Sequence, residues 1–134
     1  MIFLDTSALY ALADRADAHH TEARRLFAAI TAADETLFTH SYILVECAAL
    51  MQRRLGLTIA TAFLNDMKGF PVAWVDQALH TKALTDFARR ARRKISFVDC
   101  VSFVLMRERG SHTAFAFDDD FSKEGFALYN ARRQ

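Results

Sequence analysis

The sequence is poor in cysteine, proline and glycine. Its 134 residues include two cysteines, one proline and four glycines. Small secreted domains stapled by disulfides carry many more cysteines, and collagen-like or low-complexity chains carry much more proline and glycine, so these classes are excluded. Cys47 and Cys100 each lie in an apolar run, and we predict that both are small buried hydrophobic residues. The sequence therefore indicates a folded domain without a disulfide framework.

Long hydrophobic runs and an excess charge of one sign are also missing. The apolar stretches are shorter than the ~18 residues of a membrane-spanning helix, and the first segment, MIFLDTSALYAL, has no basic leader. The formal net charge is only +1, so the overall charge predicts no particular partner. We expect a soluble cytoplasmic protein that does not use a membrane.

The residues that are abundant indicate one well-packed domain. Hydrophobic residues make up 52% of the chain and charged residues 25%, and twelve residues are phenylalanine. A chain of this length buries about two thirds of the surface that its unfolded form exposes, which is enough for a single core. We predict one domain over residues 1–134, with a core that includes Phe97, Phe103, Phe115, Phe117 and Phe121.

Short β-prone segments alternate with amphipathic helical segments along the chain. The pattern predicts strands at residues 2–5, 36–39, 70–76, 113–117 and 127–130, and helices at residues 6–14, 19–34, 41–56, 58–69, 76–94 and 96–110. Strands separated by helices form right-handed crossovers in a mostly parallel sheet. The predicted fold class is α/β, with a mostly parallel central sheet of four to five strands flanked by helices.

Four acidic residues occupy informative positions in this pattern. Asp5 and Asp118 each end a predicted strand, so both belong at the carboxyl edge of the sheet, where open α/β folds bind ligands. Glu46 lies within the apolar segment YILVECAAL and Asp99 within SFVDCVSF. A charge in apolar surroundings is costly unless it is paired or bound to a metal, so each position requires an explanation.

Each acid also has a structural explanation of its own. Asp99 follows Ser96 by three residues and could be the reciprocal acid of a capping box. Glu46 could face solvent or pair with Arg53 on the same helix. Asp5 could cap the helix that follows it. The functional interpretation therefore depends on all four acids together.

Four motifs carry a resemblance to a known family: LDTSAL near the start, VE in the third helix, SFVD at a late helix start and FDDDF after the last long strand. Together they resemble the PIN domain, particularly the single-domain VapC toxin ribonucleases. The resemblance implies a PIN-like three-layer fold and a metal-dependent endoribonuclease of a toxin–antitoxin pair. It also implies a homodimer, an RNA substrate and a cognate VapB-type antitoxin. The acidic positions of the family fall here on Asp5, Glu46, Asp99 and Asp118.

The residue types indicate the chemistry of such a site. A ligand set made only of oxygen, without histidine or thiolate, suits a hard ion such as Mg²⁺ or Mn²⁺. Asp5, Asp99 and Asp118 are the candidate metal ligands, and Glu46 could hold metal or orient the attacking water. Hydrolysis of a phosphodiester in this way would leave 3′-hydroxyl and 5′-phosphate ends.

Three further residues are candidates for supporting roles. Thr6 or Ser7 could support Asp5 or contact a phosphate, because their amides open a helix and helix N-termini favour anions; the alternative is that they are only helix caps. Asp120 could replace or assist Asp118, because three aspartates follow one another at residues 118–120.

One dense basic run lies at the end of the predicted fifth helix, at Arg89, Arg90, Arg92, Arg93 and Lys94. It could follow RNA phosphates, or it could be a solvated helix end, where cations are favoured in any case. Neither interpretation identifies a target sequence.

Two other functions compete with the nuclease. One is a catalytically idle PIN-like module that binds protein or nucleic acid. The other is a phospho-receiver signalling domain, which also gathers aspartates at a sheet edge. The placement of Glu46 and Asp99 on helices, and the lack of a lysine in the expected place after a final strand, argue against the receiver domain.

Overall fold

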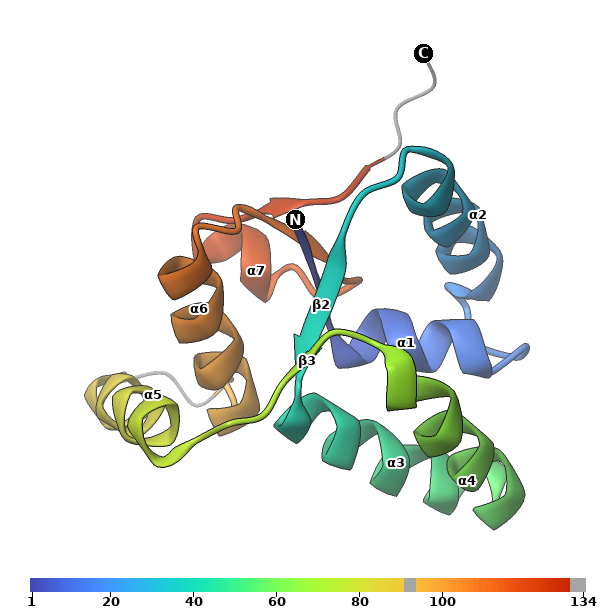
Figure 1. The fold of residues 1–134 in the computed structure, drawn as a ribbon, viewed down its shortest axis with the longest axis horizontal. Helices are drawn as coiled ribbons and strands as arrows, with labels where there is room; N and C mark the ends of the chain where they lie inside the picture. Colours follow the sequence, from blue (N-terminus) through green and yellow to red (C-terminus); the bar gives the residue numbers. More distant parts are fainter. Residues whose placement is uncertain (91–93, 131–134) are drawn as a thin grey trace.

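Five parallel strands form the centre of the protein (Figure 1). The structure is a computed structural model and describes residues 1–90 and 94–130. The order across the sheet is β3-β2-β1-β4-β5. The strands are β1 (Ile2–Leu4), β2 (Leu37–His40), β3 (Val72–Ala73), β4 (Thr113–Phe115) and β5 (Ala127–Leu128).

Helices cover both faces of this sheet. In Figure 1, α1 to α4 lie to one side of β2, and α5 and α6 lie to the other. Helix α3 packs against α4, and α5 packs against α6. The predicted three-layer α/β fold is therefore confirmed. The helices are α1 (Thr6–Ala13), α2 (His20–Ala32), α3 (Ser41–Leu55), α4 (Leu57–Asp66), α5 (Gln77–Arg89), α6 (Phe97–Arg109) and α7 (Asp120–Lys123), with a 3₁₀ turn at Met67–Gly69.

Phenylalanine fills the core, as the composition predicts. Phe3 on β1 is paired in register with Phe38 on β2, and their rings meet edge to face at 5.4 Å. Edge-to-face contacts of this kind add about 1 kcal/mol beyond the burial of apolar area. Of the five predicted core phenylalanines, three have no exposed surface, namely Phe103, Phe115 and Phe121. The other two, Phe97 and Phe117, are partly buried and pack against the core.

Two other predictions about composition can be compared with the structure. Cys47 and Cys100 are both free and fully buried, which confirms their prediction as buried hydrophobic residues. Over the described part of the chain, no helix combines the length and the apolar character that crossing a bilayer requires.

Strands β4 and β5 each end two residues before their predicted ends, and three larger differences from the predicted elements occur. Strand β3 is only two residues long, because it is an edge strand that pairs with β2 alone and follows Pro71, which has no N–H to donate. Helix α5 ends at Arg89 rather than Lys94, and residues 91–93 lie outside the described part. The acidic turn after β4 contains the short helix α7, whose residue Phe121 is buried in the core.

The topology places the candidate site. All five strands run in one direction, so their carboxyl ends share one edge of the sheet. Asp5 follows β1 directly, and Asp118 lies three residues after the end of the neighbouring strand β4. Strand pairing thus brings Asp5 to this edge and Asp118 close to it, but the prediction that Asp118 directly ends its strand is wrong, because the pairing of β4 with β1 stops at Phe115.

Candidate functional site

A pocket of about 450 Å³ opens at this edge, between α1, α3, α6 and the segment after β4. Its walls include all four predicted acids, together with residues that sequence reasoning did not assign to the site. We refer to it as the acidic pocket, which is lined by Asp5, Thr6, Ser7, Glu46, Ala49, Leu50, Arg53, Ser96, Asp99 and Asp118.

Asp5 is the N-cap of α1 and is held by Ser7. The Asp5 carboxylate accepts hydrogen bonds from the Ser7 backbone N–H at 3.1 Å and the Ser7 hydroxyl at 2.8 Å. The same hydroxyl accepts a hydrogen bond from the backbone N–H of Phe117 at 2.9 Å. Ser7 therefore ties the start of α1 to the segment that carries Asp118. The capping role and a role in the pocket coexist at Asp5.

The electrostatic state of Asp5 is unusual for an aspartate. Its side chain is 5% exposed, and burial raises its pKa to about 7 against the hydrogen bonds from Ser7, which lower it. The charges of Asp99 and Glu46 raise the pKa further. An ionised Asp5 is therefore costly in the absence of a compensating cation.

Glu46 is less buried than its apolar sequence neighbours suggested. It lies on an exposed face of α3, so of the two structural explanations the solvent-facing one is correct, and the apolar residues around Glu46 in the sequence do not surround its carboxylate. The Thr6 hydroxyl donates a hydrogen bond to the Glu46 carboxylate. Thr6 thus supports Glu46, while Ser7 supports Asp5. Within residues 1–90 and 94–130, Glu46 forms no ion pair with Arg53.

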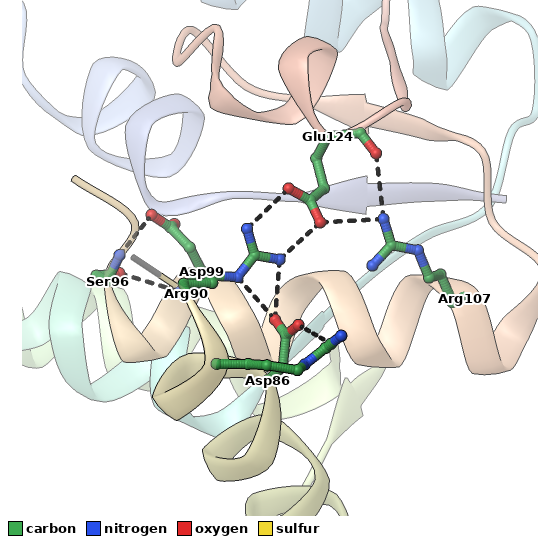
Figure 2. Close-up of polar contacts among 7 residues, drawn as sticks. Asp86, Arg90, Ser96, Asp99, Arg107 and Glu124 are labelled. Carbon is green, nitrogen blue, oxygen red and sulfur yellow. Dashed lines mark hydrogen bonds and ion pairs between the residues drawn. The ribbon is translucent and has the colours of Figure 1, made fainter. Parts of the chain in front are cut away.

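Asp99 is the reciprocal acid of a capping box at the start of α6. Its backbone N–H donates to the Ser96 hydroxyl at 3.0 Å, and its carboxylate accepts from the Ser96 backbone N–H at 3.3 Å (Figure 2). Burial raises the pKa of Asp99 to about 6, and the charges of Asp118 and Glu46 contribute to this increase. The structural explanation is therefore correct for Asp99, yet its carboxylate also lies among other acids.

Asp118 and Asp120 complete a group of three carboxylates. One oxygen each of Asp99, Asp118 and Asp120 lies within 4.8 Å of the others, and we call this group the acidic triplet. The backbone N–H of Asp120 donates to the Asp118 carboxylate at 2.9 Å, and burial and the Asp118 charge raise the pKa of Asp120. Asp119 is exposed and lies 3.5 Å from Lys123. The structure thus brings both Asp118 and Asp120 to the site.

The acidic triplet has the chemistry of a site for a hard divalent cation. It offers only carboxylate oxygens, and Asp5 and Glu46 line the same pocket without belonging to the triplet. The raised pKa values of Asp5 and Asp99 show that their charges are poorly compensated by the protein itself. Mg²⁺ and Mn²⁺ bind such oxygen ligands, usually together with water. The residues present fit a cation of this kind.

In the basic run predicted at the end of α5, Arg89 and Arg90 are bound by acidic residues, whereas Lys94 is exposed. Arg90 forms two hydrogen bonds to Glu124, at 3.0 and 2.6 Å, and one to Asp86 at 2.9 Å (Figure 2). Arg89 also pairs with Asp86, at 2.8 Å. These contacts join α5 to the end of α7, so Arg90 is neither a solvated cation nor one that is free for phosphate. Arg92 and Arg93 lie outside the described residues.

One basic residue of the pocket was missed by sequence reasoning. Arg53 in the last turn of α3 lines the acidic pocket. Its spacing from Glu46 was visible, but it suggested only an ion pair on the helix surface. The presence of Arg53 in the same pocket as Asp99 and Asp118 depends on how α3 packs, which no local pattern reveals.

Comparison with known proteins agrees with this geometry. Residues 2–126 match the PIN domain family. The chain is 38% identical over 128 residues to the 23S rRNA-specific endonuclease VapC20 of Mycobacterium tuberculosis, in strains CDC 1551 / Oshkosh and ATCC 25618 / H37Rv. The match covers 94% of this chain and 95% of the relative.

A solved structure is similar over the same extent. The crystal structure of Mycobacterium tuberculosis VapC20, described as a sarcin-ricin loop cleaving toxin, superposes with a TM-score of 0.85 at 35% sequence identity. The superposition covers 95% of this chain and 97% of that structure. This chain therefore belongs to the PIN domain family, in its VapC group of toxin ribonucleases.

Proposed function

We propose that this protein is a metal-dependent endoribonuclease, the toxin of a type II toxin–antitoxin pair, that hydrolyses RNA phosphodiester bonds in the cytoplasm. The observation that carries the proposal is the acidic triplet of Asp99, Asp118 and Asp120, placed beside Asp5 and Glu46 in one pocket. The similarity to VapC20 supports the reaction class and makes the sarcin–ricin loop of 23S rRNA the first substrate to test.

The acids have distinct proposed roles. Asp99, Asp118 and Asp120 would hold a Mg²⁺ or Mn²⁺ ion, and Asp5 would contribute directly or through water. The ion would supply Lewis-acid chemistry, polarising the phosphate and lowering the pKa of water. Glu46, held by the Thr6 hydroxyl, orients the attacking water with its second oxygen. These groups form the proposed catalytic machinery.

Ser7 has a positioning role in this scheme. Its hydroxyl donates to Asp5 and accepts from the Phe117 N–H, so it fixes the separation between α1 and the residues that lead to Asp118. Helix α1 also points its N-terminus toward the pocket, where its partial positive charge favours an anion such as a phosphate.

The partners of the protein are also proposed. A VapB-type antitoxin would cover the acidic pocket with a basic residue, in keeping with its acidic lining. A homodimer has support in the exposed apolar side chains of α3, α4 and the segment after β3, namely Val45, Leu57, Leu64 and Trp74. Size-exclusion chromatography with light scattering measures the oligomeric state directly.

The proposal is tested by cleavage of 23S rRNA and of an isolated sarcin–ricin loop RNA. The purified protein is incubated with Mg²⁺ or Mn²⁺, or with EDTA, and the cuts are mapped by primer extension. We expect metal-dependent cuts that vanish in Asp5→Asn. The matched control is Asp76→Asn, which alters the N-cap of α5 outside the pocket and should cut normally.

The outcome also separates the competing functions. Cation binding measured by calorimetry without cleavage of any RNA would favour the idle binding module over the nuclease. The receiver alternative has no support in the family assignment, and Glu46 and Asp99 lie on helices α3 and α6.

A further inference from the structure

A second pocket adjoins the acidic one at the acidic triplet. It has a volume of about 400 Å³ and is lined by Arg90, Lys94, Ile95, Asp120, Lys123 and Glu124. Asp118 lines the acidic pocket and Asp120 lines the second one, while their carboxylates lie within 4.8 Å of each other. The triplet thus stands at the junction between two hollows, each of a size that suits a small ligand.

The cations of the second pocket differ in what they already bind. The Arg90 guanidinium is occupied by Asp86 and Glu124 and is 19% exposed. Lys123 is exposed and forms a 3.5 Å ion pair with Asp119, which is also exposed. An exposed ion pair of this kind contributes little to stability. Lys94 is exposed and forms no ion pair within the described residues. Two lysines are therefore available to an anionic ligand.

Arg53 is the corresponding cation of the acidic pocket. Its side chain is exposed, and it forms no ion pair or hydrogen bond with another described residue. The adjacent Arg54 differs, because its guanidinium lies over the Tyr10 ring at 5.4 Å. The chain thus offers two neighbouring arginines, of which one faces the pocket and the other is engaged by an aromatic ring.

We propose that the RNA strand crosses the acidic triplet from one pocket to the other, with Arg53 binding a phosphate on one side of the scissile bond and Lys94 and Lys123 binding one on the opposite side. This inference rests on the proposed nuclease function and adds the path of the substrate. A polyanion that approaches five carboxylates needs cations on both flanks, and these three side chains are the cations that the two pockets leave available. Arginine suits the role because its planar fork binds a phosphate through two hydrogen bonds.

Binding measurements test each flank. RNA affinity is measured at several salt concentrations in an Asp5→Asn background with Mn²⁺, for Arg53→Ala and for the double variant Lys94→Ala/Lys123→Ala. Each lost phosphate contact should reduce the slope of log K against log salt by about 0.7 for single-stranded RNA. The controls Arg54→Ala and Arg24→Ala remove exposed arginines that line neither pocket and should keep the slope.

Chemical substitution of the RNA tests whether the two flanks lie on opposite sides. A single neutral methylphosphonate is placed at successive positions around the mapped cut, in cleavage assays with the active enzyme. We expect Arg53→Ala to raise KM by about tenfold and to become insensitive to a neutral phosphate on one side of the cut only. The double lysine variant should become insensitive on the other side only.

The outcomes distinguish failure of the proposed RNA path from failure of the proposed nuclease function. If Arg53→Ala matches Arg54→Ala in salt slope and KM, or if both pocket variants lose sensitivity to the same phosphate, the proposed path is wrong even though the wild-type enzyme cuts RNA. If the wild-type enzyme cuts no RNA but the salt slopes change as expected, the path is supported and the nuclease function fails. Circular dichroism melting confirms that every variant is folded.

Discussion

Replacing Asp99 by asparagine should stabilise the metal-free protein at pH 8 while abolishing cleavage. Burial and the neighbouring acids raise the pKa of Asp99 from 3.8 to about 6, a difference that corresponds to about 3 kcal/mol. Asparagine removes the charge and keeps an oxygen that can accept the Ser96 N–H, but it adds amide donors without assigned partners. We therefore expect a net gain of about 1–2 kcal/mol, or a melting temperature higher by about 4–8 °C.

The stability difference between wild type and Asp99→Asn should depend on pH. Because the folded-state pKa of Asp99 lies above the unfolded value, its contribution to stability is fully present below pH 3.8 and is lost as the pH rises through about 6. Wild type and Asp99→Asn should therefore differ at pH 8 and converge near pH 4. Thermal melting in EDTA across this range measures the effect.

The control and the refuting result are both defined by the structure. Asp76 caps α5 by accepting the Leu79 N–H at 2.9 Å and does not line the acidic pocket, so Asp76→Asn should show no stability gain at pH 8. Adding Mg²⁺ should stabilise the wild type more than Asp99→Asn, so the stability advantage of the variant at pH 8 should shrink or reverse. An Asp99→Asn variant that is less stable at pH 8 in EDTA, or that still cleaves RNA, would show that Asp99 is only a helix-capping residue.

Three further predictions concern the same site and its scaffold. A bound cation needs ionised carboxylates, and burial raises the pKa of Asp5 to about 7 and that of Asp99 to about 6 in the metal-free protein, so the affinity for Mn²⁺ should fall steeply between pH 8 and pH 6. Calorimetry at both pH values tests this, and an unchanged affinity would contradict it. Ser7→Ala should lower the free energy of unfolding, measured in urea, by about 1–3 kcal/mol and should lower kcat, because the Phe117 N–H loses its acceptor. Ser7→Thr keeps the hydroxyl and should recover part of the stability and part of kcat. Arg90→Ala should cost about 2 kcal/mol, since it leaves the partly buried Asp86 with Arg89 alone and the partly buried Glu124 with Arg107 alone; a cost below about 1 kcal/mol by urea unfolding would show that this network is not needed for stability.

The fold was predictable because its signals are local. Alternating strands and amphipathic helices, with caps such as Ser96 and a left-handed Gly110 after α6, set the element order and the parallel sheet. The departures occur where tertiary context competes with local pattern. Strand β3 is short because only β2 pairs with it, and α7 forms where burial of Phe121 outweighs an aspartate-rich sequence.

The candidate site was predictable in residue type and only partly in geometry. Strand ends alone placed Asp5 and Asp118 at one edge of the sheet. The sequence left open whether Glu46 is surrounded by apolar residues or faces solvent, because an apolar run on a helix can still turn one position toward solvent, as it does here. The partner of Thr6 and the position of Arg53 depend on how α1 and α3 approach each other across the pocket.

The sequence by itself determined the alternation of strands and helices, the placement of carboxylates at strand and helix ends, and an all-oxygen chemistry suited to a hard cation. These properties follow from periodicity, capping and side-chain type, which are set by neighbours along the chain. Only the tertiary structure decided that Asp99 joins Asp118 and Asp120 within 4.8 Å, and that Arg90 is bound by Asp86 and Glu124. Such distances join residues on different elements, and they are fixed by the packing of those elements on the shared sheet and core.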